Sequence, residues 1–316
     1  MRRSRLLLLA LLAAAIAPAA ASAACPTGPG PVWAEHAAYG VYNTPVERIL
    51  ARPGTVLGVQ NETWRDSYQA AGADTAGWYM QLPALVGGVF SPKPKAQVLA
   101  KVPALVSLAN RMTTCDEPWL ALNEMLTVHS REPLGYSQRR FRENVLALAK
   151  ALHEDGVHVF LLMPRIPLDR TRYRTYWRQL SLHTDLVYEA YTFNSREVIK
   201  RGDAGGTRYL RLRWAGAIER LKKFVVAPSR AGLMIPYWTH NKGSGREGLS
   251  DNAWFRLTRI KTRAATTVGT NHGLGSLWSW GWQTNRRVGE VDPDKPKAAC
   301  HYLNERDPAL CDPASL

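Results

Sequence analysis

The chain has 316 residues, with 41 lysines and arginines against 26 aspartates and glutamates, for a formal net charge of +15. The basic residues are dispersed and no nucleic-acid-binding motif accompanies them, which argues against a nucleic-acid partner. The charge suggests affinity for an anionic surface or polymer, unless it is simply a solvated basic surface. The length suits one large α/β domain or two smaller ones.

Residues 1–23 have the features of a secretory signal peptide. An arginine-rich start precedes the apolar run at 6–16, and Ala21-Ser22-Ala23 fits a cleavage site. The run is too short for a good transmembrane helix, and no later stretch reaches about 18 apolar residues. Because Cys25 follows the cleavage site without the usual aliphatic residue, a soluble secreted protein is favoured over a lipoprotein. The mature chain, residues 24–316, is expected to be monomeric and to have no membrane partner.

Four cysteines, an even number, fit an oxidising compartment. Cys300 and Cys311 lie close together in a tail rich in proline and aspartate, which predicts a local disulfide. Cys25 and Cys115 would then form a second disulfide that ties the N-terminus to the body. No zinc-ligand or H-E-x-x-H spacing occurs, so neither a metal nor another cofactor is expected. His158, with apolar neighbours, is interpreted as a satisfied core histidine.

Helix and strand patterns alternate along most of the chain. A capped helix is predicted at 46–50 and a strand at 55–60, whereas residues 65–93 resist assignment. The helices predicted after them are 94–111 (kinked at Pro103), 137–155, 172–182, 208–224 and 252–266. The strands predicted between these helices are 119–124, 157–163, 185–192, 232–238 and 275–282.

This alternation predicts parallel strands covered by helices. Five strands from residue 119 onward, one at 55–60, and one or two in the unassigned N-terminal part give seven or eight. A single (β/α)8 barrel domain over residues 24–316, with a disulfide-tied C-terminal tail, fits this count better than an open doubly wound sheet. No G-x-G-x-x-G follows a strand, which also weighs against a dinucleotide-binding fold.

The stretch W-L-A-L-N-E at 119–124 has a helical alternative. The four residues from Thr114 have capping-box form, and Trp119, Leu122 and Met125 have helical spacing. Its position between two helical segments favours a strand, because the helix–strand rhythm requires one there.

Glu124 and Glu189 are the candidate catalytic residues. Glu124 ends the strand at 119–124, and barrel enzymes carry their chemistry at the carboxyl ends of strands. Glu189 lies in an apolar, aromatic strand, where a carboxylate is costly unless it faces a polar site or a partner. Two carboxylates at a barrel mouth suit glycoside cleavage. In the structural alternative, Glu189 pairs with an arginine or lysine inside the barrel. Glu62, in a second Asn-Glu pair after a strand, is the reserve carboxylate.

Aromatic residues near the strand ends suit a sugar ligand. Trp278, Trp280 and Trp282 alternate along the last strand, which predicts that all three point to one face. Trp282 is nearest the end of the strand and is the preferred stacking platform. The alternative is that the indoles pack between the barrel and its helices. The full set of expected substrate contacts is Asn123, Tyr191, Trp238, His240, Trp280 and Trp282.

Two features of the sequence carry a resemblance to a known family: the motif Leu122-Asn123-Glu124 and, more loosely, the tryptophan-rich last strand. In these features the chain resembles the clan of retaining (β/α)8 glycoside hydrolases with an Asn-Glu acid/base pair. The resemblance implies that Glu124 is the acid/base and that Asn123 contacts the sugar. It also implies a second glutamate three strands later, where 232–238 carries no acidic residue; Glu189 is only two strands on. A missed strand, a different carboxylate arrangement or a loss of catalysis would each explain this difference.

The sequence therefore predicts an exported glycoside hydrolase that cleaves a neutral or anionic poly- or oligosaccharide with two carboxylates and no metal. The alternative is a non-catalytic exported barrel that binds cell-wall glycans or anionic polymers through its tryptophans and basic surface. A purely structural exported protein is the third hypothesis.

Overall fold

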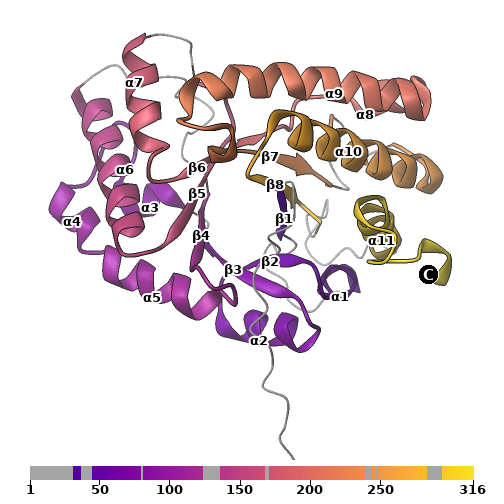
Figure 1. Ribbon diagram of the computed structural model, residues 1–316, viewed down its shortest axis with the longest axis horizontal. Helices are drawn as coiled ribbons and strands as arrows, with labels where there is room; N and C mark the ends of the chain where they lie inside the picture. Colours follow the sequence, from indigo (N-terminus) through magenta and orange to yellow (C-terminus); the bar gives the residue numbers. More distant parts are fainter. Residues whose placement is uncertain are drawn as a thin grey trace, which may run out of the picture.

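The computed structural model describes residues 31–36, 45–79, 81–123, 136–167, 171–238, 243–246, 248–282 and 294–316. In this part of the chain, eight parallel strands follow one another around a closed barrel, and β1 pairs with β8. Helices surround the barrel on its outer side (Figure 1). The predicted (β/α)8 architecture is confirmed.

The barrel strands are β1 (Val32–His36), β2 (Val56–Val59), β3 (Asp74–Tyr79), β4 (Trp119–Leu122), β5 (His158–Met163), β6 (Asp185–Glu189), β7 (Ala231–Pro236) and β8 (Ser276–Trp280). The first helices are α1 (Pro45–Leu50), α2 (Glu62–Ala70), α3 (Leu82–Val86), α4 (Lys95–Leu99), α5 (Val102–Met112) and α6 (Tyr136–Glu154). They are followed by α7 (Thr171–Leu180), α8 (Ser195–Lys200), α9 (Gly202–Leu221), α10 (Asp251–His272) and α11 (Lys295–Arg306). Short 3-10 turns lie at Lys222–Phe224, Pro228–Arg230 and Pro313–Ser315.

The stretch at 119–124 contains a strand, so its helical alternative is wrong. β4 pairs with β3 on one side and with β5 on the other. The N-terminal part supplies two strands that the sequence left unassigned, β1 and β3. Pro103 does not kink a long helix, because α4 and α5 are separate helices. It is the second residue of α5, where its missing N–H costs no helical hydrogen bond.

Side chains alternate between the barrel interior and the layer of helices, as the pleat of a strand requires. The interior is filled by apolar and aromatic groups, among which the Trp278 ring lies 5.7 Å from Trp78 and 5.1 Å from Phe160. The outer layer forms a second, larger apolar core beneath the helices. Because the interior is packed, a ligand site belongs at an end of the barrel or outside its wall.

Helix α11 lies against the outer side of β1, and a buried ion pair joins the two elements. Glu35 of β1 is fully buried, and its carboxylate accepts hydrogen bonds from Ser279 of β8 and from Tyr302 and Arg306 of α11. Burial raises the pKa of Glu35, although the Arg306 charge and the three hydrogen bonds oppose this rise. Glu35 faces the helices, so we interpret it as a structural carboxylate.

A second polar cluster lies where β5 and β6 begin, at the amino-terminal end of the barrel. The His158 ring contacts Asp185 at 3.1 Å and Glu117 at 3.2 Å, and Arg230 contacts Asp185 at 3.1 Å. Burial pulls the pKa of His158 down, but the two carboxylates outweigh it, so the pKa is raised. The His158 ring therefore has hydrogen-bond partners, as predicted, but its side chain is 23% exposed at the end of the barrel and does not lie in the core.

The disulfide between Cys300 and Cys311 is present and joins α11 to the tail, with 5.3 Å between the two Cα atoms. This confirms the predicted local bridge. Cys115 is also disulfide-bonded. Its expected partner, Cys25, lies outside the described residues, as does the predicted signal peptide.

Candidate functional site

The carboxyl ends of the strands form the mouth of the barrel, and Glu189 is an acidic residue at this end. It ends β6, two residues after the interior residue Val187, so its side chain is also directed inward. The residue is 7% exposed. Placed at this end of a barrel strand, Glu189 lies where barrel enzymes carry their chemistry.

Three partly exposed rings lie together beside this carboxylate, and we call Tyr191, Trp238 and Trp280 the mouth aromatics. The Tyr191 ring lies 4.8 Å from Trp238 and 5.5 Å from Trp280, and the two indoles are 5.2 Å apart. The Tyr191 hydroxyl donates to the Met234 sulfur at 3.0 Å, which fixes the phenol against the interior. Ends of β6, β7 and β8 thus contribute to one aromatic surface.

Asn123 follows β4 and is 7% exposed. Its backbone N–H donates to the Tyr79 carbonyl, and its own carbonyl accepts from the Leu82 N–H, both at 3.0 Å. These bonds hold the residue in line with β4, so its side chain shares the inward face of Ala121. The predicted catalytic residue Glu124 and the predicted contact His240 lie outside the described residues.

The prediction that three tryptophans of the last strand point to one face is wrong for Trp282. β8 ends at Trp280, and Gly281 has a φ of +86°, so the alternation of the strand does not continue. The Trp282 indole is fully buried and stacks on Tyr237 at 4.4 Å, within the helical layer. It offers no free face to a sugar. Trp278 is also fully buried, inside the barrel.

The reserve carboxylate Glu62 is an exposed residue in the first turn of α2. It forms a 2.9 Å ion pair with Arg111, in which both side chains are about half exposed. This partner gives Glu62 a structural explanation that needs no substrate.

The closed barrel settles one of the explanations for the missing second glutamate. β4 pairs with β5, β5 with β6 and β6 with β7, so no strand was overlooked between Glu124 and Glu189. β7 reads A-G-L-M-I-P and has no carboxylate. The explanation by a missed strand is therefore wrong, and a different carboxylate arrangement or a loss of catalysis remains.

Lys261 of α10 is a residue that the sequence reasoning missed. It is fully buried, and its Nζ donates to the carbonyl oxygens of Pro236 and Ser244, at 2.8 Å each. Burial lowers the pKa of Lys261 well below its usual value. These bonds tie the end of β7, next to Trp238, to the chain beyond residue 242. The amine also lies over the rings of Phe193, Tyr237 and Trp254.

The pattern of α10 contained a signal for this residue. Lys261 lies three to four residues from Leu257, Ala264 and Ala265, all of which are buried. A charged residue in the middle of an apolar helical stripe indicates a buried partner.

Within the described residues, no group of His, Cys, Asp and Glu side chains is arranged to hold a metal ion. Likewise, none of the described helices combines the length and the apolar character needed to span a membrane.

No family model matches the chain, and no curated protein matches it. Among solved structures, GH5_18 from Streptomyces cattleya in complex with GlcNAc is similar at 11% identity and a TM-score of 0.50, over 83% of this chain and 75% of that one. An endo-β-1,4-mannanase from Cellulomonas fimi is 13% identical, with a TM-score of 0.49 over 86% of this chain and 70% of its own. A D-psicose 3-epimerase is 10% identical, with a TM-score of 0.49 over 89% of this chain and 99% of its own. The first of these likenesses shows a shared fold and nothing about activity, so function rests on the site.

Proposed function

We propose that the protein is a secreted glycoside hydrolase whose site is the barrel mouth. Glu124 acts as the acid/base and Glu189 as the second carboxylate. The observation that carries the proposal is the inward-facing Glu189 beside the mouth aromatics. A nearly buried carboxylate next to partly exposed rings combines a charge for the reaction with flat surfaces for sugar rings.

The proposed chemistry divides two roles between the carboxyl groups. One protonates the glycosidic oxygen while the other attacks the anomeric carbon or activates a water molecule. Neighbouring strands are about 4.8 Å apart, so residues at the ends of β4 and β6 start from backbones roughly 10 Å apart. Glycosidases hold their two carboxyl groups about 5 to 10 Å apart, and Glu189 points inward from the end of β6.

The substrate in this proposal is a poly- or oligosaccharide that stacks on Tyr191, Trp238 and Trp280. The Asn123 amide forms no hydrogen bond within the described residues, which supports a role in binding a sugar hydroxyl. His240, four residues beyond β7, is proposed as a further polar contact.

Substitution of the two carboxylates tests the proposal. Glu124→Gln and Glu189→Gln should each lower the release of reducing ends from a panel of neutral and acidic polysaccharides by at least about 10³-fold. Each change removes a carboxyl group that donates or accepts a proton, and the amide of glutamine cannot do this. Binding of the same sugars should persist. Glu143→Gln, an exposed change on α6, serves as the matched control, and Glu62→Gln tests the reserve carboxylate. Unchanged turnover in Glu124→Gln would refute its assignment.

The second candidate function is a non-catalytic barrel that binds wall glycans or anionic polymers. The strongly basic composition favours it, as does the missing glutamate on β7. It predicts saturable glycan binding with no release of reducing ends, and an affinity that falls steeply with salt if the charge contributes. Trp280→Ala should weaken binding under both functions, whereas only the hydrolase loses turnover in Glu189→Gln.

The domain plan and the location belong to the same proposal. We assign residues 1–23 to a cleaved signal peptide and residues 24–316 to one barrel domain. The Cys300–Cys311 disulfide is compatible with an oxidising, extracellular location. Mass spectrometry of the secreted chain tests the cleavage point and would detect a lipid on Cys25.

A further inference from the structure

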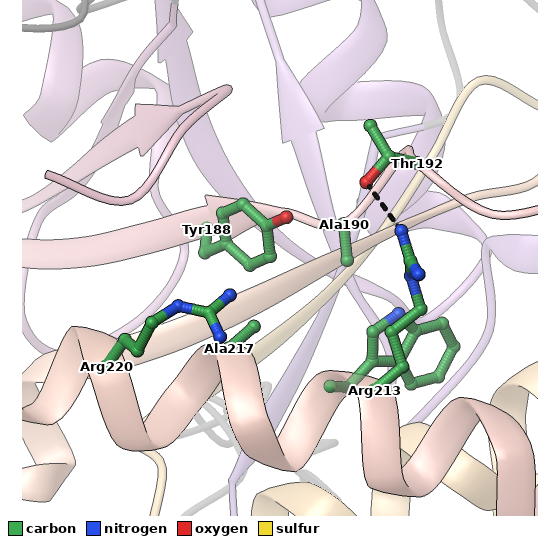
Figure 2. A pocket seen from close by; sticks show the side chains of 7 residues that line it. Tyr188, Ala190, Thr192, Arg213, Ala217 and Arg220 are labelled. Carbon is green, nitrogen blue, oxygen red and sulfur yellow. Dashed lines mark hydrogen bonds between the residues drawn. The ribbon is translucent and has the colours of Figure 1, made fainter. Parts of the chain in front are cut away.

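A pocket of about 250 Å³ lies outside the barrel wall, between the outer side of β6 and helix α9 (Figure 2). The segment that begins in β6 supplies Tyr188, Ala190 and Thr192. The helix supplies Arg213, Trp214, Ala217 and Arg220. The pocket is separate from the mouth, because Tyr188 and Glu189 are neighbours in the strand and point to opposite sides of it.

Two arginines give this pocket its charge. Arg213 and Arg220 are seven residues apart, which places them on one face of α9, two turns from each other. In Figure 2 both guanidinium groups lie on the side of α9 that faces the β6 segment. Arg213 donates a long hydrogen bond of 3.4 Å to the Thr192 hydroxyl. Neither arginine forms an ion pair within the described part of the chain.

The remaining polar groups of the pocket are also hydrogen-bond donors. The Tyr188 and Thr192 hydroxyls can each donate one hydrogen bond, and each guanidinium can donate several in a planar fork. No carboxylate is among the lining residues. A pocket with two hydroxyls and with two arginines that form no ion pair among the described residues matches a ligand that carries negative charge on several oxygen atoms.

We propose that this pocket binds an oxyanion: a sulfate, phosphate or carboxylate group, either free or carried by a single sugar unit. Its volume is below the roughly 300 to 1,000 Å³ of sites for drug-sized ligands, which limits the ligand to a small one. Arginine forks hold the oxygen atoms, and the Tyr188 hydroxyl donates to one of them. This site goes beyond the proposed hydrolase activity and does not depend on it.

Calorimetric titration of the secreted, disulfide-bonded chain at low ionic strength tests the site. The probes are inorganic sulfate, inorganic phosphate, glucuronate and glucose 6-phosphate, with glucose as the neutral control. We expect saturable binding of at least one anion and none of glucose. If glucuronate and glucose 6-phosphate bind more tightly than the inorganic anions, the ligand is a charged sugar unit. If all four anions bind with equal affinity, the ligand is a free anion. Absence of saturable anion binding below about 10 mM would overturn the proposal.

Variants separate this site from the general basic charge of the protein. Arg213→Gln with Arg220→Gln should weaken anion binding at least tenfold. Arg211→Gln, an exposed change on the same helix that does not line the pocket, should change it less than twofold. Equal losses in Arg211→Gln would show diffuse attraction and refute the site. If the double variant does not fold, Tyr188→Phe replaces it, and an affinity unchanged by this variant would count against the proposed contact.

Discussion

Replacement of Glu35 by glutamine should be among the most damaging single changes in the chain. The carboxylate has 0% exposure, and the Arg306 side chain that contacts it has 8%. Glutamine keeps the shape but removes the charge, so the Arg306 guanidinium stays buried without its counter-ion. Breaking a buried ion pair in this way costs about 3–5 kcal/mol. That is a large share of the roughly 5–15 kcal/mol by which a folded domain is stable.

Urea unfolding of the secreted chain measures this loss, and two comparisons sharpen the test. Glu62→Gln breaks an exposed ion pair with Arg111 and should cost less than about 1 kcal/mol. Arg306→Met in the Glu35→Gln background removes the uncompensated charge, so the double variant should be more stable than the sum of the two single losses predicts, by at least about 1 kcal/mol. A loss below about 1 kcal/mol in Glu35→Gln, or strict additivity, would refute this reasoning.

Three further predictions follow from the geometry. The pKa of His158 is raised in the folded protein, so His158 stabilises the fold when it is protonated. The free energy of unfolding should therefore fall as pH rises from about 6.5 through that pKa. In urea unfolding curves measured over this pH range, His158→Gln should make the fall smaller. Trp280→Ala should weaken oligosaccharide binding about tenfold and change the free energy of unfolding little. Trp282→Ala should lower the free energy of unfolding by about 3–5 kcal/mol, because this indole is fully buried. The reverse result would exchange the roles of the two tryptophans. Cys300→Ser should lower the free energy of unfolding by about 2–3 kcal/mol, since it opens a short loop to Cys311, and an unchanged urea midpoint would contradict this.

The barrel could be predicted because its later strands are nearly continuous apolar runs between long amphipathic helices. β5 reads H-V-F-L-L-M, and the pattern of α6 buries Phe141, Val145 and Leu148 as expected. β3 was not predicted, because its sequence D-T-A-G-W-Y begins with two polar residues and is not a continuous apolar run. Its Asp74 and Thr75 are buried through hydrogen bonds to the chain just before β4, a contact that no local pattern reveals.

The candidate site was less predictable because it depends on where strands end and on distant partners. Alternation correctly places Glu189 and Trp280 at the mouth. It fails at Trp282, because a glycine in the left-handed region turns the chain after β8. The role of Glu35 depends on Arg306, 271 residues away, so no motif in the sequence connects them. The oxyanion pocket likewise requires the packing of α9 on β6.

The pairing of β1 with β8 has a consequence for how the chain assembles. The first strand keeps one edge open until the chain beyond residue 276 has been made, and long-range closure of this kind is slow. If β1 closed on β8 before α11 docked, the Glu35 carboxylate would lose water before it gained Arg306. Barrel closure and α11 docking are therefore expected to form one cooperative step. Proteolytic removal of the C-terminal helix would then open the barrel along this seam, exposing two strand edges that can pair with other chains.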